Sequence, residues 1–317
     1  MRPGARRRRV LALQLVALLA VAGVAAYFSV ITPAALPAPP WFVPSSLGFE
    51  PADAVVLAEE SGPRAVAVAV RREGGRLELL ATVIGASGAG EPGLAVSFEA
   101  VSAHGNRTVA DAVASIPGAY DATMRSPAPL PRQIVVVLGR GGTAARVPFT
   151  LPGRWPVPAG GLVARAQAAY RGLHSLVTHE RLASDLTHVA VTTYDAVAPD
   201  RLRFHVVGGD ESIIIGSTRW DRAPGARWQR SPQAPIQSIT PYWADPVEDA
   251  ALLGHARVDG RATDVVSFAD PQTPAFFTIW IDQLTHRTLR LKMTAAGHFM
   301  LHRYGPFNSN ITVEPPR

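Results

Sequence analysis

Cysteine is absent from the 317 residues of the chain. Its absence excludes a disulfide framework, thiolate metal sites, a cysteine nucleophile and a lipid-modified cysteine near the N-terminus. It does not assign a compartment, because proteins outside the cytoplasm need not have disulfides. Lysine is nearly absent too, since Lys292 is the only one. We attribute the preference for arginine to genome composition rather than to function.

An excess of charge of one sign is also missing from most of the chain. The formal net charge is +6, but Arg2 and the run from Arg6 to Arg9 contribute five of the positive charges. Without them, 26 basic residues face 25 acidic ones. A nucleic-acid surface needs a clustered excess of cations. The sequence therefore argues against a nucleic-acid partner.

The common catalytic motifs are missing as well. The sequence contains no Gly-x-Ser-x-Gly, no phosphate-binding loop, no dinucleotide fingerprint and no His-Glu-x-x-His pattern. His174 and His179 lie five residues apart on an expected helix and so point in different directions. Asp282, shortly before Thr285, is expected to cap a turn rather than to act as an acid. We therefore predict that the protein is not an enzyme and has no cofactor.

The N-terminal region has the pattern of a membrane anchor. Residues 1–9 form a basic tail, and residues 10–31 are apolar apart from Gln14. About 20 apolar residues suffice to cross a bilayer as a helix, and the flanking arginines predict a cytoplasmic N-terminus. The predicted localisation is the cell membrane, as a single-pass protein with its C-terminal domains extracytoplasmic. A cleaved signal peptide is the alternative, although its apolar region usually has about 7–15 residues. Residues 32–52 read as a proline-rich linker.

The next segment, residues 53–151, is typical of an all-β domain. Clusters of Gly, Pro, Ser and Asn separate short strand-like runs at near-regular intervals, which favours a small β-sandwich. The runs are residues 65–70, 77–84, 94–101, 118–124 and 134–138.

This segment resembles the immunoglobulin-like extracytoplasmic domain that follows the membrane part of bacterial copper-resistance protein D relatives. The residues that carry the resemblance are Gly90-Glu91-Pro92-Gly93-Leu94-Ala95-Val96-Ser97-Phe98, Pro117-Gly118-Ala119-Tyr120-Asp121-Ala122 and Val147-Pro148-Phe149. The apolar stretch that ends in Ile31-Thr32-Pro33-Ala34 resembles the last span of that family. The other spans of such a transporter are missing, so transport does not carry over. A copper site needs several soft or imidazole ligands close together, whereas this segment offers His104 and Met124.

The largest segment, residues 160–317, begins with a helical pattern and continues with strands. Leu162, Ala166, Ala169, Leu173 and Leu176 recur at steps of four and three, which predicts an amphipathic helix ending near Ala183. Strand-like runs follow at residues 188–194, 202–207, 211–217, 226–229, 250–258, 262–268, 275–281, 288–295 and 298–304. The predicted fold class is mainly β (α+β), with a curved antiparallel half-barrel packed on one long helix.

This segment resembles the bacterial lipoprotein-carrier and lipoprotein-sorting superfamily, together with its mycobacterial lipid-carrying relatives. The resemblance covers about 150 residues, and it implies a half-barrel fold that binds a lipid or a lipidated partner. The mycobacterial relatives are anchored through a lipidated cysteine, which this chain lacks. The motifs that carry the resemblance are Ala169-Tyr170-Arg171-Gly172-Leu173, Pro199-Asp200-Arg201-Leu202-Arg203, Ile213-Ile214-Ile215-Gly216, Trp220, Trp228, Val258-Asp259-Gly260-Arg261-Ala262, Ile279-Trp280-Ile281-Asp282 and residues 285–290.

A half-barrel closed by a helix would leave an interior lined by alternate strand residues. Apolar side chains there would shelter an acyl chain at about 25 cal/mol for each Å² removed from water. Alternatively, the same side chains simply pack on the helix. The candidates are Phe204, Val206, Ile213, Ile215, Trp220, Trp228, Phe268, Phe277, Ile279 and Met293.

A metal site is the second hypothesis for this segment. His298 and His302 alternate in step along an expected strand, with Met300 between them. Together with His286 they would make a three-imidazole site. Surface histidines without a ligand are the alternative.

The sequence therefore predicts a membrane-anchored, non-catalytic protein that binds a lipid, another hydrophobic ligand or a lipidated protein. A copper-homeostasis accessory protein that works with a copper-transporting membrane protein is the alternative. A scaffold or sensor domain is the third hypothesis, and it predicts a filled core with an exposed apolar patch.

Overall fold

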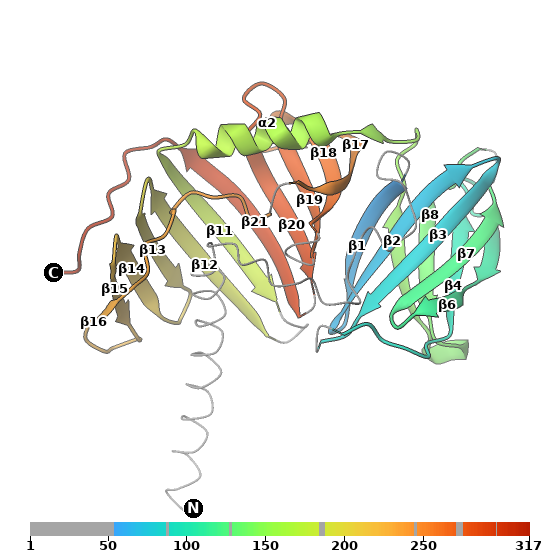
Figure 1. Ribbon diagram of the computed structural model, residues 1–317, viewed down its shortest axis with the longest axis horizontal. Coiled ribbons are helices and arrows are strands. Elements are labelled where there is room, and N and C mark those ends of the chain that lie inside the picture. The colour runs from blue at the N-terminus through green and yellow to red at the C-terminus, as the bar shows by residue number, and fades with distance from the viewer. Residues whose placement is uncertain are drawn as a thin grey trace, which may run out of the picture.

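The computed structural model describes residues 54–86, 89–126, 129–183, 188–243, 246–270, 275–295 and 297–317. Within these residues the chain is almost entirely β. One α-helix, α2 (Gly160–Arg171), and one short 3-10 helix, η2 (Gly141–Thr143), accompany three antiparallel sheets. Figure 1 shows a large sheet with α2 across it, beside a smaller body of two sheets.

The smaller body is a β-sandwich. Its first sheet has the spatial order β1 (Ala54–Ser61), β2 (Arg64–Glu73), β3 (Arg76–Ile84), β7 (Ala119–Arg125) and β6 (Val113–Ile116). Its second sheet has the order β5 (Arg107–Asp111), β4 (Val96–Val101), β8 (Gln133–Leu138) and β9 (Ala145–Thr150). Buried residues from both sheets form one shared and mostly aliphatic core. Each sheet therefore covers the apolar face of the other.

The third sheet has twelve strands and is open. Its spatial order is β10 (Val157–Pro158), β17 (Glu248–Val258), β18 (Arg261–Asp270), β19 (Ala275–Asp282), β20 (Thr288–Ala295), β21 (His298–Phe307), β11 (Ser175–Ala183), β12 (Val189–Val197), β13 (Arg201–Val206), β14 (Glu211–Ile215), β15 (Thr218–Arg222) and β16 (Gln229–Pro232). Two meanders, β11–β16 and β17–β21, meet where β21 pairs with β11. The last strand of the chain thus joins the two halves of the sheet (Figure 1).

Helix α2 defines the two faces of the large sheet. Val163, Ala166 and Tyr170 recur at helical spacing and are buried in one core cluster with residues of β18–β21. The helix ends before Gly172, whose backbone N–H bonds back to the carbonyl of Ala168. We call the helix-covered face of the sheet the inner face and the opposite face the outer face.

The sandwich packs on part of the outer face. Strand β2 alternates alanine and valine, and both sets of side chains are buried. The valines, such as Val68, belong to the sandwich core, whereas Ala67 and its alanine neighbours pack with Ala269, Phe276 and Phe299 of the large sheet. Small side chains on this side of β2 let the two units approach closely, so the alternation serves two interfaces.

The predicted fold class needs correction. We expected an α+β half-barrel on one long helix, but the described chain is nearly all β and α2 has 12 residues. Residues 175–183, assigned to the end of that helix, form β11 instead. Gly172 ends the helix, and the β-branched Val177 and Thr178 favour the extended strand that follows. The half-barrel is replaced by an open twelve-stranded antiparallel sheet.

The predicted single-pass membrane localisation is likewise not supported. None of the helices in the described ranges is both long enough and apolar enough to span a bilayer. Helix α2 would extend about 18 Å, against the roughly 30 Å of a hydrocarbon core, and it contains Arg165 and Arg171. The stretch 10–31, on which the prediction rested, lies outside the described residues, as do the predicted basic tail and linker.

Candidate ligand-binding site

A segment without regular structure covers the centre of the inner face. Residues 233–243, which we call the inner segment, leave β16 and run back across β12 and β11 (Figure 1). Ile236 packs with Tyr194, Leu202 and their neighbours on one half of the sheet. Tyr242 and Trp243 pack with the core under α2, and Ile239 contacts both clusters. The inner segment therefore fills the space that a second sheet fills in the sandwich.

Aromatic rings anchor the end of the inner segment. Phe268 of β18 and Phe277 of β19 are stacked with ring centroids 5.2 Å apart. The indole of Trp243 meets both rings edge-on, at 5.6 and 6.1 Å. The Trp243 Nε1–H is buried and has no hydrogen-bond partner in the described part of the chain. Shape and apolarity thus hold this side chain, while its one polar group stays unsatisfied.

A buried polar network interrupts the apolar inner face between β12, β11 and β21. The Nε2 of His302 lies 2.8 Å from Glu180 Oε2, and the Tyr194 hydroxyl donates to Glu180 Oε1 at 2.8 Å. The Nδ1 of His302 lies 3.0 Å from the Tyr304 hydroxyl. The two ring nitrogens of His302 therefore link Glu180 of β11 to Tyr304 of the same strand as the histidine. His302 is fully buried, and the Tyr242 ring of the inner segment covers it at 4.4 Å between centroids.

The network fixes the protonation of its phenols. Burial raises the pKa of Tyr194 well above its ordinary value, and the adjacent charge and hydrogen bond of Glu180 raise it further. Burial likewise raises the pKa of Tyr242, and the Glu180 charge adds to the effect. Both phenols therefore remain neutral hydrogen-bond donors at physiological pH.

A second polar group lies on the inner face near the β16 edge. Arg219 of β15 is 8% exposed and pairs with Asp221, with both carboxylate oxygens 2.8 Å from its Nε. The Ser212 hydroxyl donates to the same carboxylate. The guanidinium also lies over the Phe204 ring, 5.8 Å from its centroid. Burial makes this cluster costly unless it is fully paired, and these contacts satisfy it.

The structure divides the predicted lining residues between the two faces. Strand register places Ile213 beside Trp220, on the outer face together with Ile215. Trp228 lies in the turn between β15 and β16. The remaining predicted residues lie on the inner face, most of them in the core under α2 and the inner segment: Phe204, Val206, Phe268, Phe277, Ile279 and Met293.

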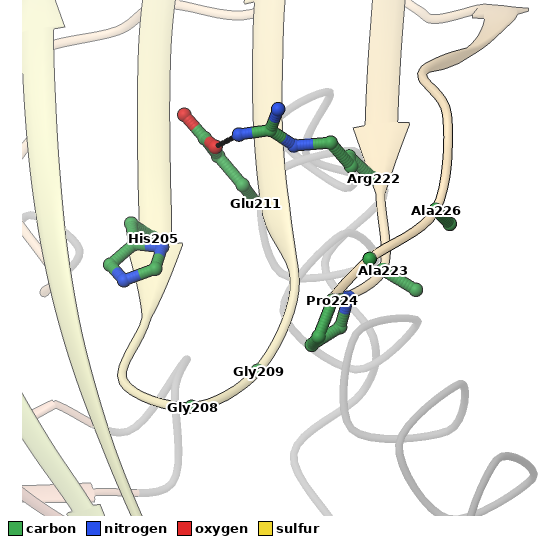
Figure 2. A pocket seen from close by; sticks show the side chains of 9 residues that line it. His205, Gly208, Gly209, Glu211, Arg222, Ala223, Pro224 and Ala226 are labelled. Atoms are coloured by element: carbon green, nitrogen blue, oxygen red, sulfur yellow. Dashed lines mark hydrogen bonds and ion pairs between the residues drawn. The ribbon is translucent and has the colours of Figure 1, made fainter.

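A concave surface lies on the outer side, at the far end of the sheet. The β13–β14 and β15–β16 turns enclose a cavity of about 420 Å³. Figure 2 shows His205 and Gly208 at one side of it and Pro224 at the other, with the Glu211–Arg222 ion pair above. The glycines and alanines of the two turns have no long side chains to close over the cavity. The cavity is therefore open to solvent rather than a closed binding chamber.

The three histidines proposed as metal ligands do not converge. His302 is buried in the Glu180 network, whereas His298 is exposed and pairs with Ala295 at one end of the β20–β21 hairpin. His286 precedes β20, at the other end of the hairpin. Throughout the described residues, no group of three or more His, Asp or Glu side chains is placed to hold a metal ion. The Asp282 prediction is confirmed, because this carboxylate accepts bonds from the Thr285 backbone and hydroxyl at 2.7 Å.

Sequence reasoning missed the polar network of the inner face. Glu180 lies in the stretch that we predicted as a helix. On a helix, residues two apart such as Thr178, Glu180 and Leu182 do not share a face. On a strand, these three residues share one face, and Glu180 is the charged member of an otherwise uncharged row. A period-two reading of residues 175–183 would have found it. Its partners Tyr194 and His302 come from distant strands, and a single sequence does not pair them.

Comparison with solved structures finds neighbours at low similarity. No family model matches the chain, and no curated protein matches it. The solved lipoprotein LppX from Mycobacterium tuberculosis is similar at 15% identity, covering 49% of this chain and 97% of that chain, with a TM-score of 0.39. LprF from Mycobacterium bovis matches at 14% identity over 50% of this chain and 96% of its own, with a TM-score of 0.36.

A LolA superfamily protein from Nitrosomonas europaea matches at 12% identity, over 48% of this chain and 93% of its own, with a TM-score of 0.24. The resemblance to copper-resistance protein D relatives and the immunoglobulin-like assignment are not shown by the comparisons. Because all three TM-scores are below 0.5, the function proposed below rests on the geometry of this chain.

Proposed function

We propose that the twelve-stranded unit binds a hydrophobic ligand on its inner face, without catalysing a reaction. The ligand would be a lipid, or the acyl chain of a lipidated protein. One observation carries the proposal: the centre of a long apolar sheet face is covered by the irregular inner segment rather than by a helix or a second sheet. An acyl chain would contact the same side chains that now contact Ile236, Ile239 and Trp243.

Displacement of the inner segment is easier than displacement of a strand. Residues 233–243 form no ladder with the sheet. Their docking rests on the burial of a few apolar side chains and on isolated hydrogen bonds, such as those that Ser238 donates to the carbonyls of Pro199 and Val197. The unpaired Trp243 Nε1–H weakens the docked state by about 1–3 kcal/mol relative to a satisfied donor. A ligand that replaces these contacts buries the same apolar surface of the sheet. The free energy of replacing the inner segment by the ligand is therefore expected to be close to zero.

The polar network gives the proposed ligand a chemical character. Tyr242 leaves the His302 ring if the inner segment moves away, and Glu180, His302 and Tyr194 then face the ligand. These groups donate and accept hydrogen bonds within a row of apolar residues. An amphiphile with a hydrogen-bonding group near the middle or end of its chain fits this pattern better than a plain hydrocarbon.

The test uses the purified full-length chain. Native mass spectrometry and solvent extraction identify lipid that co-purifies, and titration with the fluorescent fatty acid cis-parinaric acid measures affinity. Ile239→Ala weakens the docked inner segment by about 2 kcal/mol, so apparent ligand affinity is expected to rise roughly 10- to 30-fold. The affinity rises because less free energy is needed to displace the segment.

Ile134→Ala is the matched control, since Ile134 is fully buried in the sandwich core, away from the inner face. It is expected to lower stability without changing ligand affinity. The proposal is wrong if the wild-type chain shows no saturable binding, or if Ile239→Ala only destabilises the protein. In that case the inner segment is ordinary core packing, and the scaffold hypothesis becomes the best one.

A further inference from the structure

The outer face of strands β11–β16 carries an excess of arginine. Strand register places five arginines on this face, all of them exposed, against two carboxylates, Asp195 and Glu211. Glu211 pairs with both Arg203 and Arg222. The five arginines are Arg181, Arg201, Arg203, Arg222 and Arg230. This concentration of charge contrasts with the nearly neutral remainder of the chain.

Two tryptophans lie among these arginines. Arg222 stacks over the Trp228 ring, 4.5 Å from its centroid, and Arg230 lies over Trp220 at 6.0 Å. Both indoles are only partly buried. Tryptophan combines an apolar ring with a polar N–H, and it is enriched where a protein meets the interface of a bilayer. The cation–π contact keeps each guanidinium over its ring at an exposed position of the sheet.

Exposed aliphatic side chains adjoin the arginines. Val207 and Val191 are 67% and 45% exposed, and the Val207 N–H bonds to the Val191 carbonyl at 2.8 Å. Val189, two residues along the same face of β12, is 43% exposed. Arg181 of β11 lies directly opposite Val191. Solvated valines next to cations are unexpected on a face that meets only water, but they suit a surface that is both anionic and apolar.

We propose that the outer face of β11–β16 docks on the surface of an anionic lipid bilayer. The arginines would meet lipid phosphates, the tryptophans would lie at the headgroup level, and Val191 and Val207 would reach the upper acyl region. The cavity between the two turns lies at the same end of the sheet and keeps Arg222 accessible (Figure 2). Charge complementarity together with the exposed valines favours a bilayer over a soluble anion.

The test is flotation of the full-length protein with vesicles, either pure phosphatidylcholine or phosphatidylcholine with 30% phosphatidylglycerol. Binding is expected to be stronger on the anionic vesicles and to weaken with salt. Each arginine near an anionic surface contributes about fivefold in affinity, so R181Q/R230Q is expected to lose roughly 25-fold. Every variant keeps residues 1–53, so any contribution of that segment is constant.

The matched control is R76Q/R140Q, which removes two exposed arginines from the sandwich and is expected to bind like the wild type. V191S/V207S is expected to lose the part of the binding that resists high salt. The proposal is overturned if R181Q/R230Q binds as tightly as the wild type or the control loses as much. It is also overturned if millimolar glycerophosphate abolishes vesicle binding, or if an oligonucleotide binds in preference to vesicles. Docking is measured without a hydrophobic ligand, so its outcome is independent of the function proposed for the inner face.

Discussion

The two halves of the molecule cover their apolar faces in different ways. In the sandwich, two sheets bury each other, and the core cluster contains no charged residue. Its semi-buried carboxylate, Glu99, faces outward to Arg146 and Arg107. In the twelve-stranded unit a helix and an irregular segment cover one face of a single sheet. That face buries Glu180, His302 and Arg219.

The difference shows where each unit is optimised for stability. Burial of apolar side chains stabilises a fold directly. Buried ionisable groups rarely stabilise a fold more than well-packed apolar residues would. The large sheet retains two such groups, Glu180 and His302, at the centre of the face that we propose for ligand binding. Its inner face therefore has the features of a site, while the sandwich has those of a structural support.

Removal of the buried carboxylate is expected to give the largest effect. Glu180→Ala leaves His302 Nε2 and the Tyr194 hydroxyl without their acceptor in a buried place, at a cost of about 3–5 kcal/mol in the free energy of unfolding. Glu99→Ala in the sandwich is expected to cost about 1 kcal/mol, because Arg146 remains solvated. Urea unfolding compares the two.

A paired replacement sharpens this comparison. The double variant Glu180→Leu/His302→Leu removes both members of the buried Glu180–His302 pair and is expected to be far less damaging than Glu180→Ala. Equal losses for Glu180→Ala and Glu99→Ala would contradict the distinction between the two units.

The pH dependence of stability is expected to originate in the large unit. Burial raises the pKa of Asp249 to about 7, and the charge of Glu248 adds to the effect. Asp249 lies at an irregularity of β17, with a left-handed φ of 53° and a buried Oδ1 that has no hydrogen-bond partner in the described residues. Between about pH 4 and pH 7 the unfolded chain loses this proton while the folded chain keeps it. Stability therefore falls as pH rises through that window, by about 4 kcal/mol.

Asp249→Asn tests this effect, because asparagine keeps the shape and tolerates the same backbone conformation. The variant is expected to equal the wild type near pH 4 and to exceed it by up to about 4 kcal/mol at pH 8. Chemical unfolding across this pH range gives the measurement. Parallel curves for the two proteins would show that Asp249 does not cause the dependence.

The sequence predicted strands well where a short apolar run is bounded by turn residues. It located β3, β8, β18 and β20 to within a few residues for this reason. It missed β11, since Leu173 and Leu176 extended the helical spacing past Gly172. It also predicted a strand at residues 226–229, whereas residues 226–228 lie in the turn after β15 and β16 begins at Gln229.

The candidate site was predicted only in part. Phe268, Phe277 and Ile279 are apolar residues on predicted strands, so their shared face follows from alternation. Ile213 and Trp220 lie on the outer face. Their face was not predictable, because a single sequence does not determine the register of β14 and β15. The inner segment was unpredictable, since nothing local in residues 233–243 shows that the chain returns across the sheet. Such contacts depend on the whole fold.

The smallest expected loss of stability comes from the ion pair that joins the two units. The only lysine, Lys292 of β20, pairs with Glu59 of β1 and donates to the Ala58 carbonyl at 3.1 Å. Glu59 is 44% exposed in this pair, so solvent screens the attraction and Lys292→Gln is expected to cost about 0.5 kcal/mol. A double-mutant cycle with Glu59→Gln measures the coupling, which salt should weaken. The contacts between the alanines of β2 and the phenylalanines of the large sheet bury far more area than the ion pair. They are expected to hold the two units together when the ion pair is removed. A coupling above about 2 kcal/mol would contradict this view and make the ion pair the principal link between the two units.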